Sequence, residues 1–214
     1  AAAGKLVVLV PVGSLEPHGP HLSLETDTEI SLGAAELAAA RLEERGLVAR
    51  IAPAVPYGVT ECAGAFPGAV SVPAAALTAY LGAVVDGFLA AGAAHVCLVN
   101  NHLEPDHDRA VRAAQDGRDR ARVSVACPLT RRWARTLSDE FKRGNCHAGR
   151  YETSLVIAAG QPVSGHDQLD GLDLSLSEGI SAGKTSFLEM GMTRAYTGTP
   201  HEASNAEGES LYER

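Results

Sequence analysis

Three side chains that can bind a metal lie close together near the start of this 214-residue chain. Glu16 and His18 are two residues apart, so an extended or looping backbone can point both to one side. Asp27 follows, directly before a segment with helical character. Imidazole nitrogen and carboxylate oxygen are ligands for Zn, Mn and Fe. The alternative is that Glu16 and His18 are ordinary loop residues and that Asp27 caps a helix.

A second cluster repeats the same spacing. His102 and Glu104 are also two residues apart, and they follow the apolar run 95–99, as Glu16 and His18 follow the apolar run 6–12. Parallel strands bring their carboxyl ends to one edge of a sheet, so we expect both clusters to meet there. Mixed nitrogen and oxygen ligands favour a two-metal site over a thiolate-rich structural zinc site. The predicted ligands are Glu16, His18, Asp27, His102 and Glu104.

A third segment, 145–154, contains His147 and Glu152 beside a glycine-containing turn at the expected start of a helix. Taken alone, this pattern leaves two readings open. His147 either faces a functional cavity or caps the helix.

These residues lie in a chain that alternates between strand-like and helix-like segments. Single glycine and proline residues separate the segments. The alternation predicts one α/β domain over residues 1–214, with a mostly parallel sheet between two layers of helices. Beyond residue 160 the chain is polar and glycine-rich, and we predict no element there. Strands are expected over 5–12, 47–52, 70–72, 95–99 and 123–126, and helices over 28–45, 74–91, 106–118, 129–142 and 151–159.

The overall composition indicates which binding partners and which cellular compartment to expect. A net charge of -8 argues against binding to nucleic acid, and we read Arg131, Arg132 and Arg135 as one solvated helix face. No apolar run approaches the roughly 18 residues that span a membrane, and we recognise no signal peptide. The four cysteines form no C-x-x-C pair. We expect reduced cysteines and a cytoplasmic protein.

Residues 11–28 resemble the signature of the creatininase (creatinine amidohydrolase) family. Further stretches agree with the family pattern in the same order along the chain, so the resemblance covers roughly residues 6–208. These stretches are Tyr57-Gly58, Phe66–Ser71, Asn101–Glu104, His147–Ser154 and Gly198–Pro200.

This resemblance implies a metal-dependent hydrolase that cleaves the C–N bond of an amide, cyclic amide or formamide in a small molecule, with a hydroxide between the metals as the nucleophile. It also implies a single three-layer α/β/α domain, commonly assembled as a hexamer, with two divalent metal ions per chain. Carried over by motif, Glu16 and His102 serve one metal, and His18 and Glu104 serve the other. Asp27 bridges the two metals.

The resemblance also implies catalytic roles. His147 lies beside the substrate as a proton donor, and Glu152 supports the site from close by. Glu104 belongs to the catalytic set as well as to the metal ligands.

The chain departs from the creatinine-hydrolysing pattern at positions that would surround a flat ring. Leu103 stands where an aromatic residue is expected, and no tryptophan precedes His147 closely. Arg143 and Arg150 are candidates for contact with an anionic substrate instead. Three alternatives therefore stay open: a peptide-trimming enzyme of cofactor maturation, a metal-dependent lyase or isomerase, and a metal-binding homologue without turnover.

Overall fold

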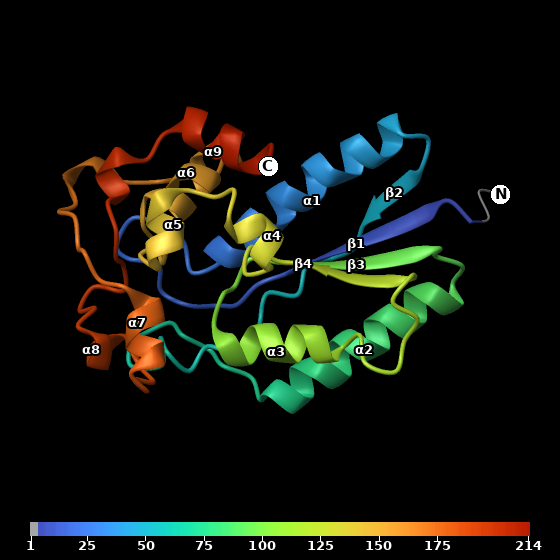
Figure 1. The fold of residues 1–214 in the computed structure, drawn as a ribbon, viewed down its shortest axis with the longest axis horizontal. Helices are drawn as coiled ribbons and strands as arrows, with labels where there is room; N and C mark the ends of the chain where they lie inside the picture. Colours follow the sequence, from blue (N-terminus) through green and yellow to red (C-terminus); the bar gives the residue numbers. More distant parts are fainter. Residues whose placement is uncertain (1–3) are drawn as a thin grey trace.

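The computed structural model describes residues 4–214 and contains a four-stranded parallel sheet (Figure 1). Its strand order is β2-β1-β3-β4, and every pairing is parallel. The two central strands end together, because Val12 of β1 pairs with Asn100 of β3. The strands are β1 (Leu6–Val12), β2 (Val48–Ile51), β3 (His95–Asn100) and β4 (Val123–Ala126).

Helices cover both faces of this sheet (Figure 1), which confirms the predicted three-layer α/β/α architecture. Helix α1 (Thr26–Glu44) packs against β1, β2 and β3 on one face. Helices α2 (Ala74–Ala90) and α3 (Pro105–Ala113) pack on the other face. Alternate β1 side chains feed the two cores, since side chains along a strand point to opposite faces.

Two predicted elements differ from the structure. The strand expected over 70–72 is wrong, because Val70 forms only an isolated bridge with Leu15 and the chain then turns into α2 at Pro73. The helix expected over 129–142 is two short helices, α4 (Arg131–Ala134) and α5 (Asp139–Arg143). The Ser138 side chain accepts a hydrogen bond from the amide of Phe141 and so starts α5 as a new helix.

The C-terminal third, for which no element was predicted beyond residue 160, forms short helices. Helix α9 packs against α6, and α7 and α8 lie beside the carboxyl ends of the strands (Figure 1). No helix among residues 4–214 is long and apolar enough to cross a bilayer. The elements are α6 (Arg150–Ala158), a 3₁₀ turn (His166–Gln168), α7 (Leu176–Ser181), α8 (Phe187–Met190), a second 3₁₀ turn (Pro200–Glu202) and α9 (Asn205–Tyr212).

The contact between α6 and α9 depends on Gly208. A side-chain carbon at this position would collide with the backbone carbonyl of Ser154 and with Ala158. We expect Gly208→Ala to lower the free energy of unfolding by about 1–3 kcal/mol, the usual effect of overpacking. Urea denaturation measures the change.

The control for this substitution is Ser210→Ala on the exposed side of α9 itself. This change is expected to alter the free energy of unfolding by less than about 0.5 kcal/mol, because substitutions of exposed residues usually have small effects. Equal stability of Gly208→Ala and the unmodified protein would contradict the close helix contact.

Candidate metal centre

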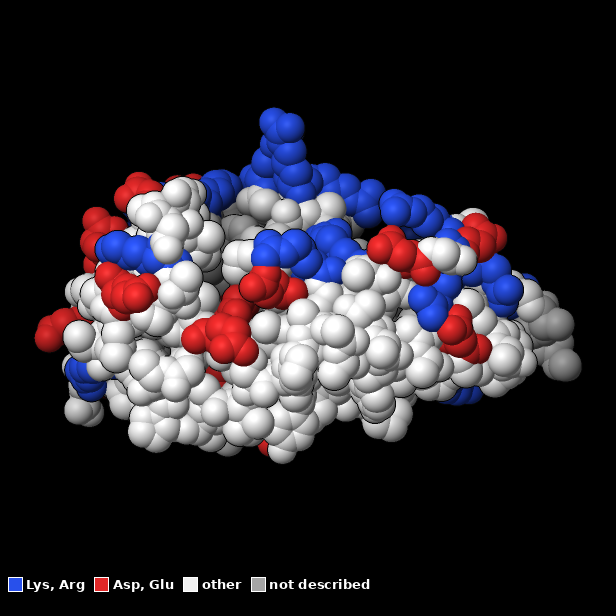
Figure 2. All heavy atoms as spheres, turned by 90° about the horizontal axis from the view of Figure 1, so that it is seen from below, with Lys and Arg blue, Asp and Glu red and all other residues white. Residues whose placement is uncertain are grey.

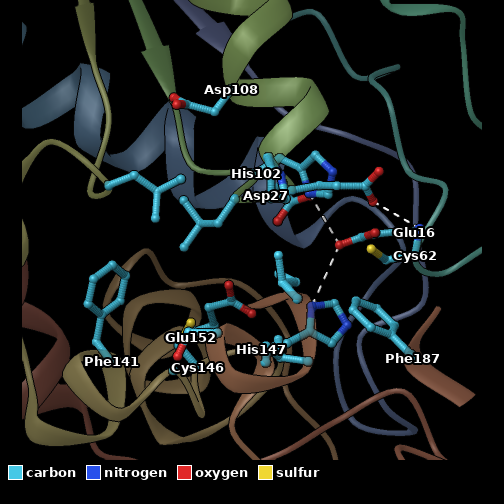
Figure 3. A pocket seen from close by; sticks show the side chains of 18 of the residues that line it. Glu16, Asp27, Cys62, His102, Asp108, Phe141, Cys146, His147, Glu152 and Phe187 are labelled. Atoms are coloured by element: carbon cyan, nitrogen blue, oxygen red, sulfur yellow. Dashed lines mark hydrogen bonds and ion pairs between the residues drawn. The ribbon is translucent and has the colours of Figure 1, made fainter. Parts of the chain in front are cut away.

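Four of the predicted ligands lie together at the carboxyl ends of β1 and β3, and Figure 3 labels three of them, Glu16, Asp27 and His102. Glu16 and His18 lie in the loop that follows β1, and His102 lies in the loop that follows β3. Asp27 lies in the first turn of α1 and is not its cap, because Glu25 occupies that position. All four side chains are buried.

Asp27 lies between two histidines. Its Oδ1 is 3.2 Å from Nε2 of His18, and its Oδ2 is 2.9 Å from Nδ1 of His102. Among residues 4–214, neither Nε2 of His18 nor Oδ2 of Asp27 makes a hydrogen bond, although both atoms are buried. Buried polar atoms without a partner are costly, so they point to a ligand that sits between them. The arrangement suits a carboxylate that bridges two cations.

The side chains form two overlapping ligand groups that share Asp27. One group is Glu16, Asp27 and His102, and the other is His18, Asp27 and Glu152. In each group the ligand atoms lie within 4.8 Å of one another. A third group joins Glu16 and His18 to His147, whose Nδ1 is 3.6 Å from Oε1 of Glu16.

Backbone carbonyl groups orient the three histidines. When each ring is neutral, one nitrogen donates a hydrogen bond to a carbonyl and the other nitrogen faces the cluster without a proton, as metal-binding histidines require. The bonds run from His18 Nδ1 to Glu16 O (3.0 Å), from His102 Nε2 to Val59 O (2.8 Å) and from His147 Nε2 to Pro17 O (3.0 Å).

Two further polar residues, which the sequence analysis did not single out, hold His102. The side-chain oxygen of Asn100 accepts from the His102 amide at 3.2 Å, and its side-chain nitrogen donates to the His102 carbonyl at 2.9 Å. Nδ1 of buried His107 accepts from the Val59 amide, so its Nε2 donates to Asn100 at 3.0 Å. The signal in the sequence was a polar residue, Asn100, at the end of an apolar strand.

The two remaining carboxylates of the predicted site, Glu104 and Glu152, lie in different surroundings. Both oxygens of Glu104 accept backbone amides, from Glu61 and Cys62, each at 3.0 Å. Glu104 lines the cavity but belongs to none of the ligand groups. Glu152 lies 3.6 Å from Nε2 of His18 and accepts the Ala148 amide at 2.7 Å. The structure therefore brings Glu152, and not Glu104, beside His18.

The charges of the cluster favour a cation. Burial raises the pKa of Asp27, but His102 and His18 outweigh burial and hold this pKa well below its usual range. Burial lowers the pKa of His18, but Asp27, Glu152 and Glu16 outweigh burial and raise this pKa to about 10. The buried carboxylates thus hold protons on nearby imidazoles, and divalent ions can supply the same positive charge.

A cavity of about 480 Å³ opens above the cluster (Figure 3). Its floor contains Glu16, Asp27 and His102, and most of its wall is apolar. Much of that wall comes from the short helices α5, α7 and α8. The sequence analysis placed α5 within one longer helix and missed α7 and α8, because they show no clear period. The apolar wall residues are Leu103, Leu129, Phe141, Leu176, Ile180 and Phe187.

The family model for Creatininase, described as creatinine amidohydrolase, matches residues 1–214. This chain belongs to the creatininase family. The predicted resemblance is confirmed, and the family places the chain among hydrolases.

Two proteins with named activities are similar to this chain. A mycofactocin precursor peptide peptidase from Mycolicibacterium smegmatis is 33% identical over 219 residues, which cover 96% of this chain and 79% of the relative. A creatinine amidohydrolase from Pseudomonas putida is 31% identical over 108 residues, or 48% of this chain and 40% of the relative.

Solved creatininase structures share the fold. A structure described as "Creatininase Mn" superposes with a TM-score of 0.72 at 21% identity and covers 99% of this chain and 87% of the other. A mutant creatininase described as "Zn-Zn type" gives a TM-score of 0.73 with the same identity and coverage.

Proposed function

We propose that this chain is a divalent-metal-dependent hydrolase that cleaves an amide C–N bond and holds two metal ions, Zn, Mn or Fe. The observation that carries the proposal is the position of Asp27, with one oxygen toward His18 and the other toward His102. Glu16 would complete the His102 side, and Glu152 the His18 side. Creatininases of the same fold are described with Mn or with Zn, which supports this choice of metal.

When bound, the ions would polarise the amide carbonyl and lower the pKa of water toward neutrality. The protein side chains hold the reacting groups and move the protons. Asp27 and Glu16 supply negative charge from the floor of the cavity. Glu104 is oriented by two backbone amides, and burial raises its pKa, so it is a candidate for proton exchange at the cavity wall.

His147 has the geometry to carry a proton to the leaving nitrogen. Burial and His18 lower the pKa of His147 to about 4, so the ring starts neutral. Its Nε2 donates to the carbonyl of Pro17, which leaves Nδ1 free to accept the proton that the attacking water loses. The imidazolium formed in this way then donates the same proton to the amine that departs.

The substrate is proposed to be a short peptide. The sequence favoured a small-molecule amide with peptide trimming as the alternative, and a relative named as a peptide peptidase is similar across 96% of this chain. The cavity wall agrees with this choice, because the aliphatic side chains of Leu103, Leu176 and Ile180, together with two phenylalanines, can contact the apolar side chains of a peptide. A small amide remains the second candidate.

Hydrolysis in oxygen-18 water tests the proposed reaction. Metal-reconstituted protein is incubated with lactams, formamides and short peptides, and the products are analysed by mass spectrometry. Solvent oxygen in a new carboxylate supports hydrolysis, and a product without it identifies a lyase or isomerase. Metal binding without turnover of any substrate would indicate a non-catalytic homologue.

We also propose that the chain forms a homo-oligomer, with a hexamer expected from the family resemblance. The exposed side of α2 is apolar and consists largely of small residues, including Ala75, Ala79 and Ala83, with Tyr80 beside them. Figure 2 looks onto this side of the molecule and shows a broad area without charged side chains. Exposed apolar surfaces of this kind often mark protein interfaces.

Light scattering at micromolar concentration is expected to show the oligomer. Ala79→Glu combined with Ala83→Glu should shift the protein toward smaller species, because charges do not fit an apolar interface. Arg45→Glu, an exposed change elsewhere, should have no such effect. A monomeric unmodified protein would rule out the proposed assembly.

A further inference from the structure

Charge is distributed very unevenly along this chain. Residues 109–143 contain ten of the 18 lysine and arginine residues but only four of the 26 acidic residues. This segment therefore has a net charge of +6, while the rest of the chain has a net charge of -14. So strong an asymmetry produces a local positive potential on an acidic protein.

The positive segment runs from the cavity along one edge of the sheet. Arg109 and Lys142 line the cavity itself. Strand β4 lies at the edge of the sheet, with Arg120 shortly before it and Arg131 and Arg135 shortly after it. Figure 2 shows a band of Lys and Arg side chains along one side of the molecule.

Apart from Arg122, which donates a hydrogen bond to the carbonyl of Ala93, five exposed arginines in this segment make no ion pair with any residue in the range 4–214. We name them the arginine surface: Arg120, Arg131, Arg132, Arg135 and Arg143. Other cations of the segment are already neutralised, such as Arg118 by Asp86 and Lys142 by Asp139. The guanidinium of Arg132 lies 4.2 Å from the centre of the Trp133 ring, which supports its position on the surface.

We propose that the arginine surface binds an acidic segment of the peptide substrate while a neighbouring amide bond of that peptide enters the cavity. This inference rests on the proposed function. It names the substrate class as a peptide with several Asp or Glu residues outside the bond that is cleaved. The energy of this remote contact holds the peptide in place for the reaction.

The extent of the surface favours a peptide over a small anion. Four-residue β4 separates Arg120 from the arginines of α4, and a strand of that length spans about 13 Å. An extended peptide needs roughly four residues to cover this distance. A nucleic acid fits less well, because the net charge of -14 on the rest of the chain repels a phosphate backbone.

The test compares two charge reversals of equal size. Arg131→Glu with Arg135→Glu changes the arginine surface, and Lys5→Glu with Arg45→Glu is the control. Lys5 and Arg45 are exposed, make no ion pair with residues 4–214, and lie at the ends of β1 and α1 that are remote from the metal centre. Melting temperatures establish that both proteins are folded.

The substrates are two peptides of equal length with the same apolar C-terminal residues. One carries Asp and Glu upstream, and the other carries Asn and Gln at those positions. The arginine-surface variant is expected to lose about tenfold in kcat/KM for the acidic peptide, and less than about twofold for the neutral one. The control variant should lose little with either peptide, and added salt should shrink the difference.

Binding of the same labelled peptides, measured by fluorescence anisotropy, separates the two proposals. If no peptide is cleaved but the acidic one binds in an arginine-dependent way, the proposed reaction is wrong and the proposed role of the arginine surface is supported. Equal effects of the two reversals, or no preference for the acidic peptide, would overturn the surface proposal. Tighter binding of an oligo-dT strand than of the acidic peptide would also overturn it.

Discussion

Replacing Asp27 with alanine is expected to remove both metal ions and nearly all activity. Each oxygen of Asp27 faces a different histidine, so a single substitution opens both ligand groups. Elemental analysis after dialysis should fall from about two ions per chain to none. Turnover should fall by at least about 10³-fold. This loss equals or exceeds the usual effect of removing one hydrogen-bond donor that stabilises the transition state.

Glu29→Ala is the matched control for this substitution. Glu29 is the other acidic residue in the first turn of α1, so both changes remove one negative charge from the same helix end. Glu29 belongs to no ligand group among residues 4–214, and its substitution should leave metal content unchanged. His18→Ala provides an intermediate case, because His18 belongs to the group without His102 and its loss should preferentially remove one ion. An Asp27→Ala protein that keeps two ions would refute the bridging role.

Replacing His147 with alanine is expected to keep the fold and both metal ions but to lower turnover by about 10²–10⁴-fold. This is the usual contribution of a general acid or base. His147 faces Glu16 through Nδ1 and lines the cavity, so it can reach a substrate there. Steady-state kinetics, metal content and melting temperature are measured on the same preparation.

These three measurements distinguish the other possible roles of His147. A helix-capping role would cost about 1 kcal/mol of stability with activity intact, but Gly149 is the N-cap of α6 and no side chain caps that helix. A role as metal ligand, which the third ligand group permits, would lower the metal content. Near-normal turnover with normal metal content would remove His147 from the catalytic set.

Much of this fold follows from local sequence patterns. Apolar runs that end in glycine or polar residues predicted β1 and β3, and the intervening helical segments predicted the parallel sheet. The same patterns identified Glu16, His18, Asp27 and His102, because side chains at the ends of adjacent parallel strands have to meet. The predictions of a strand over 70–72 and of one continuous helix over 129–142 were wrong. The single bridge of Val70 and the new helix start at Ser138 do not change the periodicity of the apolar residues, so the sequence pattern does not reveal them.

Tertiary structure decided which carboxylate lies beside His18 and what surrounds the site. Glu104 carries the same two-residue spacing as Glu16 and His18, yet its loop directs it to the amides of Glu61 and Cys62, and Glu152 comes from α6 instead. The walls come from helices too short to show a period. The arginines at positions 131, 132 and 135 are exposed, as predicted for a solvated face, but only the fold shows that they follow the edge strand β4. The sequence by itself determined the types of the candidate ligands and the strands that present them, and only long-range packing decided their partners and the shape of the pocket.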